Sequence, residues 1–202
     1  LLKRVVSGTF VNSPGIARLA LDEEIEAYTL PQGALSQLMR EMAAGRAGLV
    51  TKAGLHTFAD PRIGGGRQSR CATEDLVEVI QLRGEEYLFY RPYKVDVAFI
   101  RGSAIDEAGN LSMEHEAVTL EMLSIAQATR RQGGLVIAQA KTLVPRGTLH
   151  PKMVKVPGIL IDAFVIVPDQ WQTFETRDSP AYSGHHRVAL DDGGKHGEVA
   201  DA

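Results

Sequence analysis

Hydrophobic positions near the start of the chain alternate between the spacing typical of strands and that typical of helices. Residues 4–10 predict a strand, and residues 16–25 predict an amphipathic helix because apolar side chains recur every three to four positions. Residues 26–30 predict a second strand and residues 34–44 a second amphipathic helix. The pattern then repeats with a strand over residues 48–52. This rhythm is typical of an α/β protein.

The hydrophobic pattern changes over residues 76–93, where two apolar runs flank a turn at residues 83–85. Such a pattern predicts an antiparallel hairpin. Tyr87, Phe89 and Tyr90 lie on it and have two interpretations. They form a stacking platform for a base, or they pack against the sheet or another subunit. We favour packing.

The α/β rhythm then returns, with buried strands predicted over residues 95–102, 134–141 and 159–167 and a helix over residues 117–132. Strands that are apolar along their whole length are typical of a sheet covered on both faces. The predicted fold class is therefore α/β, an open and mostly parallel sheet with helices on both faces, plus the antiparallel hairpin.

Residues 1–187 are predicted to form one domain and residues 188–202 a polar tail or linker, because the last segment has too little apolar surface to fold alone. The chain begins with Leu1 rather than methionine, so we expect the domain to be truncated at its start. In open parallel sheets, ligands bind beyond the carboxyl ends of the strands. The segments predicted to meet on such a rim are residues 8–15, 30–33, 51–66, 102–116 and 141–155.

Composition narrows the classes of function. The chain has 202 residues, of which 44% are hydrophobic and 23% charged, enough for one sizeable core. A formal net charge of −3 gives no general reason to bind nucleic acid or an anionic membrane. No apolar run approaches the roughly 20 residues of a membrane-spanning helix, and no signal peptide is evident, so we expect a cytoplasmic protein. The single cysteine, Cys71, excludes an internal disulfide.

Glycines and polar side chains are concentrated over residues 30–66. Glycine allows the main chain to approach a bound group closely, while Thr51, Lys52, His56 and Thr57 supply hydrogen-bond donors. The combination suggests an anionic or carbonyl-bearing small molecule as ligand. The glycines fit neither the dinucleotide-binding nor the P-loop spacing, so an irregular structural loop is the alternative.

Other candidate groups are less specific. Glu114, His115 and Glu116 are suited to acid–base chemistry or a metal site, but acidic residues ahead of a helix also cap it, and we favour capping. The histidines do not form a zinc-binding array, so no metal site is predicted, and no G-x-S-x-G motif indicates a hydrolase.

Four motifs in order resemble the N-terminal half of the family I coenzyme A transferases, in particular the acetate or propionate type with both halves fused. They are LPQG at residues 30–33, GLVTKAGLHTFADPRIGGG at 48–66, the stretch 84–128, and GTLHPKMVKVPGILIDAFVIVP at 147–168. The resemblance extends from about residue 1 to residue 187 and implies a CoA-transferase/NagB-RpiA-like fold.

The resemblance implies reversible transfer of CoA between a short-chain acyl-CoA and a free carboxylic acid. In that family a glutamate attacks the thioester, and an incoming carboxylate resolves the glutamyl-CoA thioester, without metal or cofactor beyond the substrate itself. The implied partners are a C-terminal half or β-type subunit, and we expect a homo-oligomer because the hairpin suggests a subunit contact.

The family's nucleophilic glutamate belongs to the C-terminal half, so no catalytic residue is assigned in this chain. By resemblance, Gln32 and Gly33 lie at the active-site interface, and Gln32 is a hydrogen-bond donor to the acyl or carboxylate group. Thr51, Gly54, His56 and Thr57 are expected beside the substrate.

His56 stands where the family usually has glycine, which implies a narrower pocket or an altered choice of acid. The family's upstream glycine-rich strand-to-helix segment is absent from the sequence. Two other functions stay open at this point, a non-catalytic acyl-CoA-binding or assembly module on the same fold and an acyl-CoA thioester hydrolase.

Overall fold

A computed structural model describes residues 1–171 and 179–188 of the chain. Its strands are β1 (Arg4–Ser7), β2 (Glu26–Thr29), β3 (Leu49–Thr51), β4 (Val77–Leu82), β5 (Glu85–Tyr90), β6 (Val97–Asp106), β7 (Leu111–Ser112), β8 (Leu135–Val144), β9 (Val154–Val156) and β10 (Ala163–Ile166). Its helices are α1 (Pro14–Leu21), α2 (Gln32–Ala43) and α3 (Met122–Arg131), with short 3-10 turns η1 (Pro151–Met153) and η2 (Gly158–Leu160).

The described strands form three sheets. Strands β1 and β2 pair in parallel, while β3, β5 and β4 form an antiparallel sheet in that order. The third sheet has the order β10-β8-β6-β7-β9, in which the neighbouring strands β10, β8 and β6 are parallel and β7 and β9 are antiparallel. The α/β class with mostly parallel strands and a separate antiparallel element is thus confirmed.

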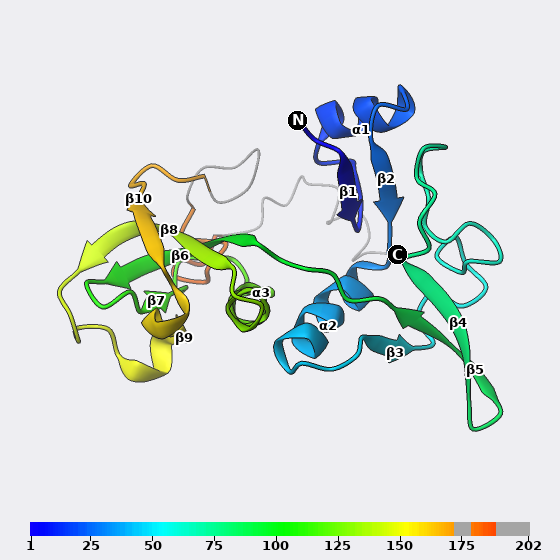
Figure 1. Ribbon diagram of the computed structural model, residues 1–202. Coiled ribbons are helices and arrows are strands. Elements are labelled where there is room, and N and C mark those ends of the chain that lie inside the picture. The colour runs from blue at the N-terminus through cyan, green and yellow to red at the C-terminus, as the bar shows by residue number, and fades with distance from the viewer. Residues whose placement is uncertain (172–178, 189–202) are drawn as a thin grey trace, which may run out of the picture.

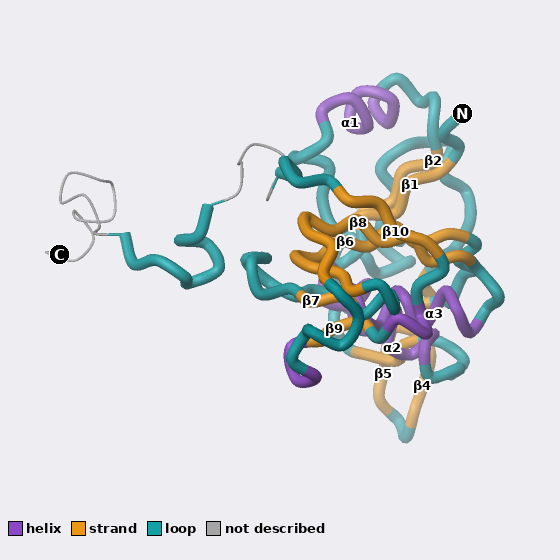
Figure 2. Tube along the Cα trace, turned by 90° about the vertical axis from the view of Figure 1, so that its left-hand side faces the viewer, coloured by secondary structure: helices purple, strands orange, loops and turns teal. Residues whose placement is uncertain are grey.

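Two helices lie between the large sheets. From left to right, Figure 1 shows the five-stranded sheet, α3, α2 and the three-stranded sheet, with β1, β2 and α1 above α2. Figure 2 shows the same elements from the side, with α1 at the top and the β4–β5 hairpin at the bottom. Helix α2 buries Leu38 and Met42 in a core that also includes Ala128 of α3 and Tyr90 of β5.

The five-stranded sheet has one buried face and one exposed face. On β6, Ala98 and Ile100 are buried, whereas Phe99 between them is 77% exposed. On β8, Val136 is buried while Leu135 beside it is exposed. Since side chains alternate between the faces of a strand, this pattern assigns the buried set to the α3 side. Among the described residues, a helix covers that side only.

The predicted hairpin is confirmed. Strands β4 and β5 pair antiparallel, and the two connecting residues, Arg83 and Gly84, both have positive φ, at 52° and 84°. Positive φ at both central residues is the geometry of a tight turn that matches the twist of the strands. Tyr90 is fully buried in the core, so its side chain packs rather than forming a stacking platform.

Several predicted details are wrong. The strand at residues 48–52 does not continue the parallel pattern, because β3 pairs antiparallel with β5. The strand ends that carry the predicted rim segments are divided among three sheets, so they do not form the single sheet edge that was predicted. Helix α2 begins at Gln32 rather than at residue 34.

Element boundaries also shift. Helix α1 ends at Leu21, before residue 25, and α3 begins at Met122 rather than at residue 117. Apart from Val188, the predicted tail at residues 188–202 lies outside the described residues.

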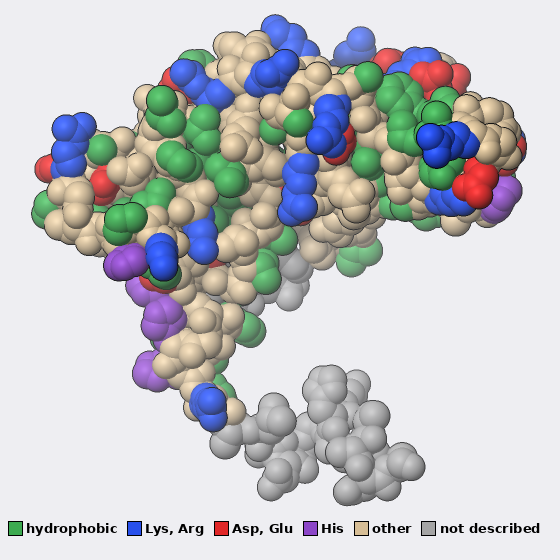
Figure 3. All heavy atoms as spheres, turned by 90° about the horizontal axis from the view of Figure 1, so that it is seen from below, with side chains coloured by type: hydrophobic (Ala, Val, Ile, Leu, Met, Phe, Trp, Pro, Cys, Tyr) green, Lys and Arg blue, Asp and Glu red, His purple; other side chains and the backbone are tan. Residues whose placement is uncertain are grey.

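Charged groups are mixed over the surface. On the face seen from below, Figure 3 shows Lys and Arg side chains interspersed with apolar and other groups instead of gathered in one basic patch. Among the described residues, no helix has the length and apolar character needed to cross a membrane.

The buried face of α2 supports a stability prediction. Leu38 is 2% exposed, so Leu38→Ala leaves a cavity in the core shared by α2 and α3. We expect it to lower the free energy of unfolding by about 2–5 kcal/mol, measured by urea denaturation. Leu21→Ala is the matched control, since Leu21 is 81% exposed and its loss is expected to change stability by less than about 0.5 kcal/mol. Equal effects of the two substitutions would contradict this account of the core.

Candidate functional site

The loop after β3, residues 51–66, is organised around one buried carboxylate. The Asp60 side chain is 1% exposed and accepts a hydrogen bond from the backbone N–H of His56 at 3.0 Å. It also accepts from Arg62, through the backbone N–H at 3.0 Å, Nε at 2.9 Å and Nη2 at 2.8 Å. The Asp60 carbonyl accepts from the N–H groups of Ile63, Gly64 and Gly65. One residue therefore holds both halves of the loop.

Arg62 ties this loop to the hairpin. Its Nη1 donates to both carboxylate oxygens of Glu86 on β5, at 3.1 and 3.0 Å. Hydrogen bonds from the Arg62 guanidinium hold the pKa of Asp60 well below its ordinary value of 3.8. The Asp60–Arg62–Glu86 network thus fixes the loop as a charged and rigid element at neutral pH.

Two glycines of the loop have packing roles. Gly54 has a φ of 98°, and a Cβ there would lie 2.6 Å from the Tyr90 hydroxyl. That hydroxyl donates to the Ala53 carbonyl at 2.7 Å, and burial raises the pKa of Tyr90 to about 12. At Gly66, a Cβ would lie 2.6 Å from Leu30. Glycine is required at these positions because the main chain approaches its neighbours closely.

The predicted donors of the loop are largely engaged within the molecule. The Thr57 hydroxyl donates to the Gly54 carbonyl at 2.8 Å, and the Thr51 hydroxyl accepts from the Ala53 N–H at 3.2 Å. Lys52 forms an ion pair with Glu85 at 2.8 Å. Thr51, Gly54 and Thr57 therefore shape the loop. Their predicted role beside a substrate stays a prediction.

His56 is the distinctive side chain of this loop. It is exposed and has a φ of 60°, a left-handed backbone that is uncommon for residues other than glycine. Its N–H is held by Asp60, while its imidazole makes no hydrogen bond to the part of the chain that the structure describes. Exposed neighbours are Thr57 and Phe58. The loop thus presents an imidazole, a threonine and an aromatic ring to solvent.

Gln32 and Gly33 lie in the first turn of α2, next to the ends of β1 and β2. The Gln32 side chain lies against Gly8, where a Cβ would be only 2.9 Å from the Gln32 Cβ. Both residues are exposed. The C-terminal end of the loop at residues 51–66 lies beside the end of β2, because the Thr29 N–H donates to the Gly66 carbonyl at 2.7 Å. The two predicted site segments therefore meet at Thr29 and Gly66.

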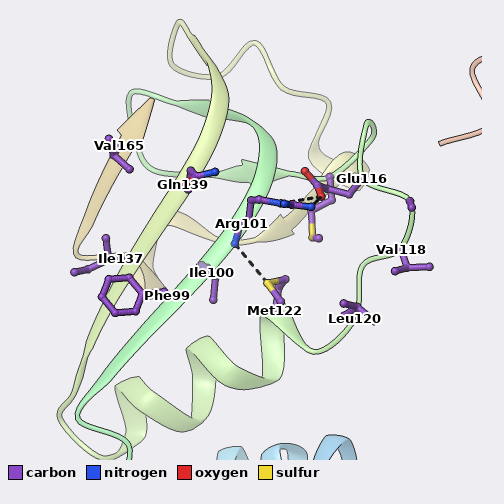
Figure 4. A pocket seen from close by; sticks show the side chains of 12 residues that line it. Phe99, Ile100, Arg101, Glu116, Val118, Leu120, Met122, Ile137, Gln139 and Val165 are labelled. Atoms are coloured by element: carbon purple, nitrogen blue, oxygen red, sulfur yellow. Dashed lines mark hydrogen bonds and ion pairs between the residues drawn. The ribbon is translucent and has the colours of Figure 1, made fainter. Parts of the chain in front are cut away.

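The acidic group at residues 114–116 does not cap a helix, so that prediction is wrong. Helix α3 begins at Met122, and its N-cap residue Glu121 makes no side-chain capping bond. Instead, Glu116 forms an ion pair with Arg101 of β6 at 2.6 Å and accepts from Gln170 at 3.1 Å. Figure 4 shows Arg101 pointing toward Glu116 across the end of the sheet. Among the described residues, no group of three or more His, Cys, Asp or Glu is placed to hold a metal ion.

Sequence reasoning missed Asp60 and Arg62. The Asp-Pro-Arg triplet was visible inside a motif, but a charged pair two residues apart is common on surfaces and does not indicate burial. The available signal was the glycines around the triplet, Gly54 before it and residues 64–66 after it, because glycine is common where the main chain folds closely on itself.

The fold is that of a solved acyl-CoA transferase. The crystal structure of the Escherichia coli O157:H7 enzyme YdiF, a thioester complex with CoA, superposes with a TM-score of 0.88 at 38% identity and covers 93% of this chain. The coenzyme A transferase family model matches residues 2–166. The chain therefore belongs to the coenzyme A transferase family.

Curated relatives of the chain are also coenzyme A transferases. The caffeate CoA-transferase of Acetobacterium woodii is 47% identical over 171 residues, which are 83% of this chain and 33% of that protein. The alpha subunit of the Clostridium acetobutylicum acetoacetyl-CoA:acetate/butyrate CoA transferase is 29% identical over 168 residues, 83% of this chain and 68% of that subunit. The chain thus spans about a third of the length of these two relatives. The match covers 33% of the caffeate enzyme and 37% of the YdiF chain.

The buried Asp60 yields a prediction on stability and pH. Asp60→Asn removes the negative charge beside Arg62 and leaves Glu86 as the one carboxylate bonded to that guanidinium among the described residues, so we expect a loss of about 1–3 kcal/mol in unfolding free energy at pH 7. Because the pKa of Asp60 is lowered by folding, its stabilisation is complete above about pH 5 and declines as the pH falls below 3.8. The difference between wild type and Asp60→Asn should therefore shrink between pH 5 and pH 3 in urea titrations.

Glu86→Gln is the control for this pair. Glu86 is 37% exposed, and we expect its loss to change stability by less than about 1 kcal/mol. A constant difference between wild type and Asp60→Asn from pH 5 to pH 3 would contradict the assigned ionisation of Asp60.

Proposed function

We propose that this chain forms the N-terminal, α-type half of a site that transfers coenzyme A between an acyl-CoA and a free carboxylic acid. The match of the family model to residues 2–166 carries the proposal. The structure adds a physical reason, since the Asp60 network fixes a loop that presents exposed polar and aromatic groups. Preorganised loops of this kind suit a reaction that depends on fixed donors around a developing oxyanion.

The nucleophile of the proposed reaction is a glutamate outside this chain. Its carboxylate attacks the thioester carbonyl to form an acyl-glutamyl anhydride and release the CoA thiolate. The thiolate then attacks the anhydride to give a glutamyl-CoA thioester and the free acid. An incoming carboxylate reverses the sequence to form the new acyl-CoA. No redox partner is required, and the CoA thioester is substrate rather than cofactor.

The residues of this chain form one wall of that site. Gln32 offers an amide donor to the acyl or carboxylate oxygen, and its exposure at the start of α2 leaves it free to do so. Gly33 has open space around it, so a substrate can approach the main chain there. Thr51, Gly54 and Thr57 support the shape of the loop that carries His56. The proposed partner is a C-terminal half or β-type subunit, and the whole is a cytoplasmic homo-oligomer.

The proposed acid is small. The names of the relatives indicate different acids. One is a caffeate CoA-transferase and another an acetoacetyl-CoA:acetate/butyrate CoA transferase. We assign a short-chain acid to this chain because the His56 imidazole occupies space beside the loop that a glycine would leave open. The ring thereby limits the size of the acid.

Because the proposed nucleophile lies outside this chain, the proposal predicts that the isolated chain is inactive. We expect no CoA transfer between acetyl-CoA and propionate by the 202 residues alone. A chimera in which the aligned part of this chain replaces its counterpart in the A. woodii enzyme should transfer CoA and lose activity to hydroxylamine after exposure to acyl-CoA. Chromatography of the acyl-CoA products measures the transfer activity before and after hydroxylamine treatment. Transfer by the isolated chain, or an inactive but folded chimera, would contradict the proposal.

The His56 backbone and side chain can be tested separately in the same chimera. His56→Gly removes the ring and also removes the energetic cost of a positive φ, which glycine adopts readily. His56→Ala removes the ring but keeps that cost. Both variants should shift kcat/KM by roughly 10-fold toward bulkier acids relative to acetate. His56→Gly should be more stable than His56→Ala by about 0.5–1 kcal/mol in thermal unfolding. Unchanged acid selectivity in both variants would remove His56 from the site.

A further inference from the structure

A cleft lined by arginines lies between the C-terminal ends of α2 and α3, the two helices that Figure 1 shows side by side. Its volume is about 630 Å³. Arg40 lines it from α2, and Arg130 and Arg131 line it from α3. Helix α2 has 12 residues and begins at Gln32, so it is roughly 18 Å long. The cleft is therefore at the opposite end of α2 from Gln32.

The acidic residues nearest the cleft along the chain are already bound to other groups. Asp162 pairs with Arg130 at 2.5 Å and also accepts a hydrogen bond from the Val136 N–H at 2.8 Å. Glu41 accepts from Arg46 through both of its carboxylate oxygens, at 3.0 Å each. Neither carboxylate is therefore available to neutralise a further arginine.

The other two arginines of the cleft keep their positive charge uncompensated. Among the described residues, neither Arg40 nor Arg131 forms an ion pair with a carboxylate. Each complements the dipole of its own helix, because it lies in the last turn. That role does not require side chains from two helices to line the same cleft, where their like charges repel each other. An anion bound between them would relieve the repulsion.

The Arg131 guanidinium lies against the backbone at the end of α2. A Cβ at Gly45 would be 2.0 Å from Nη2 and 2.3 Å from Cζ of Arg131. Gly45 also has a φ of 70°, which glycine adopts readily. The glycine that follows α2 thus makes room for the last side chain of α3. Because this contact restricts the guanidinium, Arg131 loses less conformational freedom when it binds a ligand.

The rest of the lining indicates the size of the ligand. Ala43, Ala44 and Leu160 contribute apolar groups, and Gln127 contributes a side-chain amide. A volume of about 630 Å³ is typical of small-molecule pockets and exceeds what inorganic phosphate requires. Guanidinium groups bind phosphate oxygens and stack on aromatic rings. The cleft therefore suits a molecule that has both a phosphate group and a planar part.

We propose that the cleft between the C-terminal ends of α2 and α3 binds an organic phosphate of about the size of a nucleoside diphosphate. Arg40 and Arg131 bind the phosphate oxygens, while Ala43, Ala44 and Leu160 contact the remainder of the molecule. Binding at this cleft requires no transferase activity, so its test is independent of the proposed function. An acidic segment of a partner protein is the alternative occupant.

The test measures binding to the 202-residue chain by isothermal titration calorimetry. The probes are ADP, pyrophosphate, adenosine and a hexaglutamate peptide. We expect ADP to bind at a single site and pyrophosphate to bind at least about tenfold more weakly, because it lacks the part that contacts the apolar lining. Adenosine has no charge for the arginines and should not bind measurably. Equal affinities for ADP and pyrophosphate would overturn the proposal, as would hexaglutamate binding as tight as that of ADP.

Arginine variants locate the site. Arg40→Gln and Arg131→Gln should each weaken ADP binding by at least about tenfold, because each removes charge-assisted hydrogen bonds. Arg83→Gln is the matched control, since Arg83 is exposed at the hairpin turn and lies outside the cleft. It removes the same charge and should leave the affinity for ADP unchanged. A similar loss in all three variants, or no loss in the first two, would overturn the proposal.

A glycine variant tests the position of Arg131 without a change of charge. In Gly45→Ala the new Cβ displaces the guanidinium, so we expect at least about threefold weaker ADP binding. Gly147→Ala is the matched control, because Gly147 has a φ of 77° and no atom within 4 Å of the added Cβ. It carries the same backbone cost and should bind ADP as the wild type does. Wild-type affinity in Gly45→Ala would contradict the role assigned to Arg131.

Discussion

The contact between helices α2 and α3 is the interaction on which the rest of the structure depends. Ala128 of α3 is completely buried against a core that includes Leu38 and Met42 of α2, and its small side chain allows the helices to pack closely. One helix covers the antiparallel sheet and the other covers the five-stranded sheet. The loop at residues 51–66 and the exposed face of the five-stranded sheet are therefore held at opposite ends of one layered body (Figure 1).

The glycine-rich run takes on a different meaning in this arrangement. Gly54 and Gly66 serve packing, since each lies where a side chain would collide with a neighbour. The groups left for a ligand are the His56 imidazole, the start of α2 at Gln32 and the exposed neighbours of each. In the proposed transferase site, these groups position the substrate and shape its pocket. The proposed nucleophile lies outside this chain, which spans about a third of the caffeate CoA-transferase.

Local patterns predicted the elements better than their association. The hairpin followed from Arg83 and Gly84 between two apolar runs, and α2 from its amphipathic spacing, because both depend on neighbours in sequence. The partner of β3 is Tyr90 and its neighbours, some forty residues away, and no periodicity indicates that choice. Glu116 was misjudged for the same reason, since Arg101 reaches it from another strand. Family resemblance suggested the candidate site residues, whereas the burial of Asp60 depends on how the loop folds and no local pattern indicates it.

We propose that this chain lines a CoA-transfer site and that the nucleophile of the site lies outside the chain. The most direct measurement is to trap the covalent intermediate in the A. woodii chimera with acetyl-CoA and borohydride, and to locate the modified residue by peptide mass spectrometry. We expect modification of a single glutamate outside the residues contributed by this chain. Modification of Glu114, Glu116 or any other residue among those 202 would contradict it.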